Sequence, residues 1–229
     1  MTDINLLAKE HGLFVVEDSA QAFMSCDTHG KKLGTLSDIG CFSLSMCKLI
    51  SSGQGGFCVT KDASLACRLR ELRTHGLPST FSAPKWTQLG FNFRYNDILA
   101  SIARSQLCYL DDYIFAHRRI DNAYKDLITN PNFLPIDSSD FSDNIPIYHE
   151  FIVDNQSSWI EYLSSVGVNA RPFYPCIHTA DYLGSYSDSL QFPNSRAFSA
   201  QGISLPGGPH IPSNHLEYVV EVINGRDNA

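Results

Sequence analysis

A single lysine, Lys48, ends the apolar part of CFSLSMCKLISSGQGGF, residues 41–57. A lysine whose amine is partly desolvated can act as a Schiff-base nucleophile toward an aldehyde. Ser43, on the same stretch, could contact an anion, and the glycine-rich segment 53–56 allows a tight turn close to a site. Each residue also has an ordinary alternative, because a lysine beside a glycine bend is usually exposed and a strand serine is usually only packed.

A carboxylate, Asp18, follows an apolar run in LFVVEDSAQA, residues 13–22. An unbroken apolar run is typical of a strand buried on both faces, as in a parallel sheet under helices. Ligands bind at the carboxyl ends of such strands. A buried carboxylate there needs a cationic or hydrogen-bonding partner, and a protonated ring nitrogen of a ligand would be one. A helix cap or a solvated loop acid is the alternative.

The first half of the sequence alternates helices with short buried strands, which predicts an α/β layer architecture. One helix is expected over residues 3–11, with a glycine stop at Gly12, and a second after the N-cap Asp62. Strands are expected at 13–18, 39–46 and 56–60.

A long helical pattern over residues 96–128, with room for a bend partway, is expected to bridge two domains. After it, IYHEFIV (147–153) predicts a strand, and three further helical pieces are expected, at 157–167, 192–206 and 213–224. This second block predicts a small α+β domain. We therefore expect one domain over residues 1–115 and a second over 116–229.

Composition excludes several classes of protein. The net charge of -7 and the pI near 5.5 argue against a nucleic-acid surface. No apolar run reaches the length of about 18 residues that a membrane span needs, and the N-terminus shows no secretory signal. The seven cysteines form neither a C-x-x-C pair nor a metal-site spacing, so we expect no metal and a cytoplasmic location.

Several stretches in fixed order resemble the DegT/DnrJ/EryC1/StrS family of pyridoxal-phosphate-dependent sugar aminotransferases. They are DSAQA after the first strand, SDIGCFSLSMCKLISSGQGGFCVT, LRTHG, GFNFRYNDILASIARSQL, ARPFYPCIH and ISLPGGPHIPSNHLEYVVEVI. The family pattern is roughly D-x-A-Q-A, F-S-F-x-x-x-K-x-L-x-x-G-E-G-G, N-H-G and G-x-N-x-R-M. The resemblance implies fold type I, with part of a large domain built on a mostly parallel sheet and a small α+β C-terminal domain.

The resemblance also implies roles for residues in the first domain. Lys48 would bind the aldehyde of pyridoxal 5'-phosphate and move the substrate proton. Asp18 would pair with the pyridinium nitrogen, Gln21 would lie against the phenolic oxygen, and Ser43 would contact the phosphate. Asn92 would reach the phosphate in the site of a neighbouring subunit, which implies a homodimer.

His178, in FYPCIH, falls where the family brings a loop of the small domain to the substrate pocket. A loop histidine is often only a surface group, which is the alternative. The substrates implied are a nucleotide-linked keto-sugar and an amino donor, glutamate or glutamine.

Two residues depart from the family pattern: Gln54 stands where Glu is common, and Tyr95 where Met is common. Family members are longer, so the resemblance implies that an N-terminal part is missing, with the helix N-terminus that cradles the phosphate and the aromatic that stacks on the ring. A sugar dehydratase of the same fold would have histidine in place of Lys48. A cyclitol aminotransferase, half of a split enzyme and a non-catalytic remnant remain open alternatives.

Overall fold

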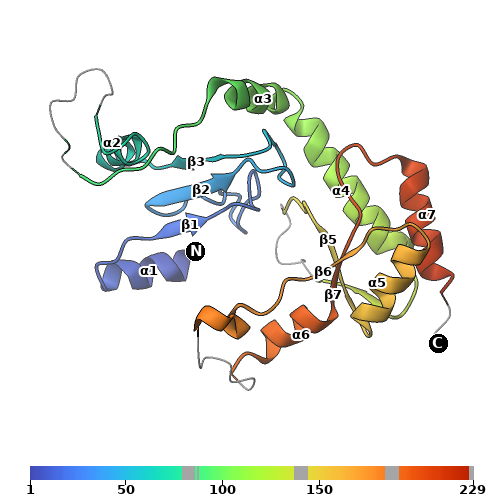
Figure 1. Ribbon diagram of the computed structural model, residues 1–229. Coiled ribbons are helices and arrows are strands. Elements are labelled where there is room, and N and C mark those ends of the chain that lie inside the picture. Colours follow the sequence, from blue (N-terminus) through green and yellow to red (C-terminus); the bar gives the residue numbers. More distant parts are fainter. Residues whose placement is uncertain (79–85, 87, 137–143, 184–190, 227–229) are drawn as a thin grey trace. The chain divides into compact units, whose positions relative to one another are not determined.

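The computed structural model of the protein describes residues 1–78, 86, 88–136, 144–183 and 191–226, and Figure 1 shows its elements. The chain forms two compact units. One comprises Met1–Asp111 with Ser139–Ile145, and the other comprises Asp112–Ser138 with Pro146–Ala229. The assignment of residues 1–115 to cofactor binding stays a prediction. Among the helices of the described ranges, none has the length and apolar content to cross a membrane.

The first unit contains a sheet with the strand order β1-β2-β3. Its strands are β1 (Val16–Asp18), β2 (Ile39–Ser43) and β3 (Gly56–Val59). β1 runs parallel to β2, and β3 runs antiparallel to it. The expected α/β class is confirmed, but this part of the sheet is mixed rather than mostly parallel. The reason is the direct bend from β2 into β3, which returns the chain alongside its own strand, whereas a parallel neighbour needs a long crossover.

The strand predicted at residues 13–18 is shorter and less buried than expected. Only its last three residues form β1, in which Val16 is 59% exposed and Glu17 is 6% exposed. β1 lies at the edge of the described sheet, so within the described residues no strand pairs with its outer side. The prediction of a strand buried on both faces is therefore wrong for this chain as described, and its buried side chain is an acid.

Among its described residues, the first unit also contains three helices: α1 (Thr2–Glu10), α2 (Ala63–Leu72) and α3 (Asp97–Leu107). The glycine stop after α1 is confirmed, because Gly12 has φ 62°, in the left-handed region. The cap of α2 is confirmed too, since the Asp62 carboxylate accepts hydrogen bonds from the N–H groups of Ser64 and Leu65 at 2.7 and 3.1 Å. Hydrogen bonds from the Ser64 hydroxyl, the Leu65 N–H and the Ser64 N–H lower the pKa of Asp62.

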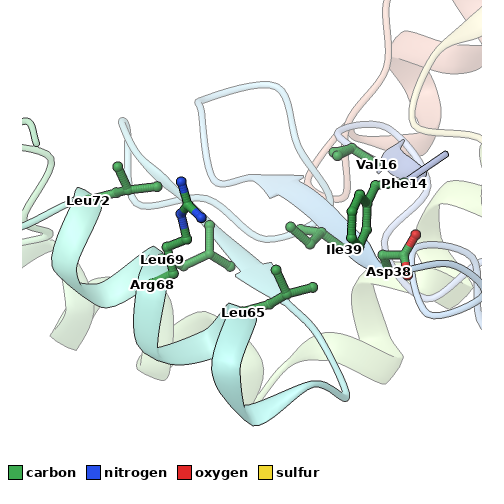
Figure 2. Close-up of a pocket in the computed structure, with 8 residues that line it drawn as sticks. All are labelled: Phe14, Val16, Asp38, Ile39, Leu65, Arg68, Leu69 and Leu72. Atoms are coloured by element: carbon green, nitrogen blue, oxygen red, sulfur yellow. The ribbon is translucent and has the colours of Figure 1, made fainter. Parts of the chain in front are cut away.

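The apolar side of α2 borders a pocket next to the sheet. Figure 2 shows Leu65, Leu69 and Leu72 on one side of the helix, with Ile39 of β2 and Phe14 across the pocket. Its remaining lining residues are Val16, Asp38 and Arg68. These three leucines, spaced four and three residues apart, therefore share one face of the helix, and that face turns toward the strands.

The long helical pattern at residues 96–128 forms two helices. α3 ends at Leu107 and α4 (Leu110–Leu127) follows after Cys108 and Tyr109. The expected bend is therefore a short break in the helix. α4 carries the chain from the first unit into the second, since the units divide after Asp111.

The second unit is an α+β layer with the antiparallel sheet order β4-β5-β7-β6. Its strands are β4 (Phe133–Pro135), β5 (His149–Val153), β6 (Arg171–Pro172) and β7 (Gly202–Leu205). Its helices besides α4 are α5 (Gln156–Ser165), α6 (Pro193–Gln201) and α7 (Ser213–Asn224), with short 3-10 turns η1 (Ile177–Thr179) and η2 (Asp181–Leu183). The predicted strand at 147–153 and the helical pieces at 157–167 and 213–224 are confirmed. The piece predicted at 192–206 is helical only as far as Gln201, because Gly202–Leu205 pair with β5 as a strand.

The core of the second unit lies between this sheet and three of its helices. Five side chains in it are 0% exposed: Ile120, Tyr124, Leu163, Ile203 and Ile223. They come from α4, α5, β7 and α7, so residues distant in the sequence meet in one apolar cluster. The Tyr124 hydroxyl donates to the Pro206 carbonyl at 2.7 Å, which satisfies the only polar atom of a ring at the centre of this core.

Candidate active site

Asp18 and Ser43 lie on the same face of the first unit's sheet. Asp18 is the last residue of β1 and stands opposite Cys41 in the parallel register. Side chains alternate along a strand, so Ser43, two residues beyond Cys41, shares its face. The Asp18 carboxylate is exposed and accepts a hydrogen bond from the Ala20 N–H at 3.1 Å. This places an available acid and a hydroxyl over adjacent strands.

Lys48 lies in the bend that joins β2 to β3. The Lys48 N–H donates to the Ser45 carbonyl at 3.1 Å, which forms a turn directly after the strand. The next two residues, Leu49 and Ile50, are each 4% exposed and anchor the bend in the interior. Lys48 itself is half-buried. A flexible amine is thus held on a fixed backbone at the end of the strand that carries Ser43.

A tyrosine of the first unit supports this bend. The Tyr95 hydroxyl is hydrogen-bonded to the Ser52 hydroxyl and lies 3.1 Å from the Leu99 carbonyl. Gly55 has φ 98°, and a Cβ at this position would stand 2.4 Å from the Tyr95 ring. Tyr95 therefore packs where only a glycine leaves room. In the sequence, Tyr95 stands out only as a departure from the family pattern. Its supporting role depends on a contact with Gly55, forty residues away in the chain, and no local sequence pattern predicts such a contact.

Gln21 and Asn92 also belong to the first unit. Gln21 is exposed in the turn after β1, which the hydrogen bond from the Ala22 N–H to the Ser19 carbonyl closes at 3.0 Å. Asn92 is exposed and bridges to Thr74, and its side-chain oxygen accepts from Arg94 Nε at 3.0 Å. Both are accessible, as a ligand-contacting role requires, and their roles stay predictions.

His178 belongs to the second unit, within η1. It is 6% exposed, and its ring stacks on Phe192 with 4.7 Å between centroids. Its Nε2 has no hydrogen-bond partner among the described residues. His178 is thus not the surface group that a loop histidine often is, and its predicted contact with substrate stays a prediction.

Glu17, next to Asp18 in sequence, points to the opposite face and has a structural role. Its carboxylate accepts hydrogen bonds from the N–H groups of Gly34, Leu36 and Ser37 at 2.8, 2.6 and 2.7 Å. Three donors compensate for the water that this buried acid loses. Sequence reasoning missed Glu17, although the alternation of faces along a strand makes one of two adjacent acids point inward.

The pKa of the Cys41 thiol is affected by the nearby Asp18 carboxylate. Burial, the neighbouring Cys58 thiol and the negative charge of Asp18 raise the pKa of the Cys41 thiol to about 11.

The pocket of Figure 2 contains none of the predicted site residues. Within the described part of the chain, no group of three or more His, Cys, Asp or Glu side chains could hold a metal ion.

The chain matches the DegT/DnrJ/EryC1/StrS aminotransferase family over residues 1–224. It is 32% identical to GDP-perosamine synthase of Escherichia coli O157:H7, an alignment that covers 98% of this chain and 61% of the relative. It is 33% identical to dTDP-3-amino-3,6-dideoxy-alpha-D-galactopyranose transaminase of Aneurinibacillus thermoaerophilus, with the same coverage of 98% and 61%. The chain thus spans about 61% of the length of these curated relatives.

A solved structure with a similar fold is S. venezuelae DesV, determined in complex with a ketimine intermediate. It superposes with a TM-score of 0.88 at 26% identity, over 98% of this chain and 61% of that chain. The likeness in fold therefore extends over both units.

Proposed function

The chain belongs to the DegT/DnrJ/EryC1/StrS aminotransferase family, and from this premise we propose that it transfers an amino group to the keto group of a nucleotide-linked sugar. Glutamate or glutamine would be the donor, and pyridoxal phosphate the cofactor. The observation that carries the proposal is the placement of Asp18 and Ser43 on one sheet face, with Lys48 in the bend that follows. The names of the two curated relatives, a perosamine synthase and an amino-sugar transaminase, support the substrate class.

The donor set fits this cofactor chemically. A carboxylate suits a protonated ring nitrogen, a hydroxyl suits a phosphate oxygen, and a primary amine suits an aldehyde. Asp18, Ser43 and Lys48 supply these three groups in turn. Pyridoxal phosphate, when bound, supplies an aldehyde that accepts amino groups and a ring that withdraws electrons.

Asp18, Lys48 and Ser43 would each have a separate role in the reaction. The Asp18 carboxylate would hold the proton on the ring nitrogen and so keep the ring cationic. The Lys48 amine would take a proton from one of the two carbons bonded to the transferred nitrogen and return it to the other, because the amine is flexible while its backbone is anchored by Leu49 and Ile50. The Ser43 hydroxyl would donate to a phosphate oxygen and fix the orientation.

The remaining roles are proposals about assembly and substrate. Asn92 would serve the site of a second copy, which makes a homodimer with shared sites the proposed assembly. His178 would contact the sugar substrate from the second unit, and Gln21 would lie against the phenolic oxygen. The cysteine pattern favours a cytoplasmic location.

Reductive trapping tests the proposal. The purified chain is mixed with excess pyridoxal phosphate, reduced with borohydride and mapped by peptide mass spectrometry, with visible absorbance recorded before and after. We expect Lys48 to carry most of the label, Lys48→Arg to remove it, and the exposed control Lys9→Arg to leave it unchanged. Label spread evenly over the exposed lysines would contradict the role of Lys48.

A further inference from the structure

Two cysteines face each other across the hairpin formed by β2 and β3. Cys41 and Cys58 are directly paired in the antiparallel register, and their sulfur atoms lie 3.7 Å apart. Further along the hairpin, the Leu44 N–H donates to the Gly55 carbonyl, so Leu44 and Gly55 form a hydrogen-bonded pair. Because hydrogen-bonded and non-bonded pairs alternate, Cys41 and Cys58 occupy a non-hydrogen-bonded pair, where Cα atoms are about 4.5 Å apart. This spacing is within the range that a disulfide bridges, about 4.4–6.8 Å.

The two thiols differ in access. Cys58 is exposed, whereas Cys41 is half-buried on the sheet face that also carries Asp18. All seven cysteines of the chain are free thiols. Cys41 and Cys58 stand directly opposite each other on adjacent strands, and this distinguishes them from the other cysteines.

We propose that Cys41 and Cys58 form an oxidation site, which a low-molecular-weight disulfide such as oxidised glutathione converts to a cross-strand disulfide. The Cys58 thiolate attacks one sulfur of the small disulfide, forms a mixed disulfide and releases one small thiol. The Cys41 sulfur then attacks Cys58, loses its proton to solvent and releases the second small thiol. Two protein thiols are oxidised and one small disulfide is reduced to two thiols, so atoms and electrons balance.

The order of the two attacks follows from the environment. Exposure makes Cys58 the entry point for a bulky oxidant. The raised pKa of Cys41 keeps it a thiol at neutral pH, so it reacts poorly with a reagent in solution. It can still resolve a mixed disulfide on Cys58, because its sulfur is held beside the target.

The bond would close a loop that contains the chemistry-bearing bend. Residues 42–57 lie between the two cysteines and include Ser43 and Lys48. Oxidation would pin the base of this bend and remove the Cys41 thiol next to Asp18. An effect on transamination rests on the proposed function, whereas the oxidation itself does not. A reversible disulfide of this kind is compatible with a reducing cytosol, where such bonds are transient.

Thiol mapping of the full chain tests the proposal. The reduced protein is incubated with oxidised glutathione at graded ratios to reduced glutathione, quenched by alkylation and analysed as intact protein and as peptides. We expect a species lighter by two hydrogens, with a peptide that joins Cys41 to Cys58, reversed by dithiothreitol. Cys41→Ser should instead accumulate one glutathionyl group on Cys58, because the resolving sulfur is gone. Cys67→Ser, at an exposed cysteine of α2, should behave as the unmodified chain.

Three results would overturn the proposal. The first is alkylation of both Cys41 and Cys58 while other cysteines are oxidised. The second is a cross-link that survives in Cys41→Ser. The third is stable glutathionylation of Cys58 in the unmodified chain, since this would mean that Cys41 does not resolve it. None of these readouts requires bound cofactor or turnover, so failure here leaves the proposed function standing.

Discussion

At the scale of single residues, the adjacent acids Glu17 and Asp18 allow stability and chemistry to be separated. Glu17→Gln replaces an acceptor of three backbone N–H groups with an amide that brings its own donors. We expect it to lower the free energy of unfolding by about 1.5–3 kcal/mol, the range for hydrogen bonds to a charged group. Urea unfolding followed by circular dichroism measures this.

Asp18→Asn is the matched change on the opposite face. Its side chain is exposed and can still accept from the Ala20 N–H, so we expect unfolding to be nearly unchanged. In a complete, active form of the protein, however, turnover should be lost, because an amide cannot hold the pyridinium proton. A fully active Asp18→Asn variant, or an Asp18→Asn as unstable as Glu17→Gln, would contradict this division of roles.

These residues also show what the sequence can and cannot predict about the site. The strand end and the bend could be located, because an apolar run and a glycine cluster are local signals. The donors around Glu17, the support that Tyr95 gives and the pairing of Cys41 with Cys58 could not, because each depends on a partner brought close by the sheet or the fold. Motif resemblance supplied the roles of the other residues, and spacing alone left them ambiguous.

At the scale of elements, the contact between α4 and β5 contains two buried histidines, and one of them, His117, predicts acid sensitivity. His117 and His149 are 5% and 1% exposed, and their rings lie 6.1 Å apart. His149 Nδ1 lies 3.5 Å from Asp121, which also pairs with Lys125 at 2.8 Å. Burial and the nearby His149 lower the pKa of His117 from 6.5 to about 4, while a hydrogen bond to the Pro146 backbone acts in the opposite direction.

The sign of the effect follows from this lowered pKa. Between about pH 6.5 and 4, His117 is protonated in the unfolded chain but neutral in the folded chain. Its contribution to the free energy of unfolding is therefore present above pH 6.5 and is lost as the pH falls toward 4. From pH 7 to pH 5 we expect a loss on the order of 1–2 kcal/mol. His117→Gln should flatten the pH dependence measured by urea unfolding, and His215→Gln, at an exposed histidine of α7, should not. Equal slopes in both variants would assign the acid sensitivity to other groups.

Elements with local signals were predicted best. α1 ends before Gly12 and α2 begins after Asp62, as predicted. The helical pattern over 96–128 forms α3 and α4, with a short break between them. Strands β4, β6 and β7 were missed. They are two to four residues long, and β7 follows α6 without a loop, so each is too short to show a periodic pattern.

At the scale of the whole molecule, exposed apolar side chains on α1, β1 and the segment between them predict self-association. Leu6, Leu7, Phe14 and Val16 are 62%, 57%, 79% and 59% exposed. Exposed apolar surface favours burial against a partner, so we expect a concentration-dependent dimer in sedimentation velocity. Phe14→Asp should weaken association, whereas Leu134→Asp, at a leucine of β4 that is 58% exposed, should not. A clean monomer over a wide concentration range would contradict this.

Affinity for pyridoxal phosphate is also a property of the whole molecule, because it depends on how much of the family's length the chain spans as well as on Lys48. The chain spans about 61% of its curated relatives, and the resemblance assigns the helix N-terminus that cradles the phosphate to the part it does not span. Without that phosphate contact we expect weak binding of pyridoxal phosphate and little transaminase activity. Addition of the N-terminal part of a relative, fused or in trans, should increase both.

Titration of visible absorbance with pyridoxal phosphate measures the affinity, and amino transfer to a nucleotide-linked keto-sugar measures the activity. In the completed form Lys48→Ala should abolish both gains, because the amine that binds the aldehyde is gone, while Lys9→Ala should preserve them. Tight binding and turnover by the 229-residue chain alone would show that the described residues already hold the phosphate. A gain that survives Lys48→Ala would instead mean that the restored affinity comes from the added part, and Lys48 would lose its assigned role.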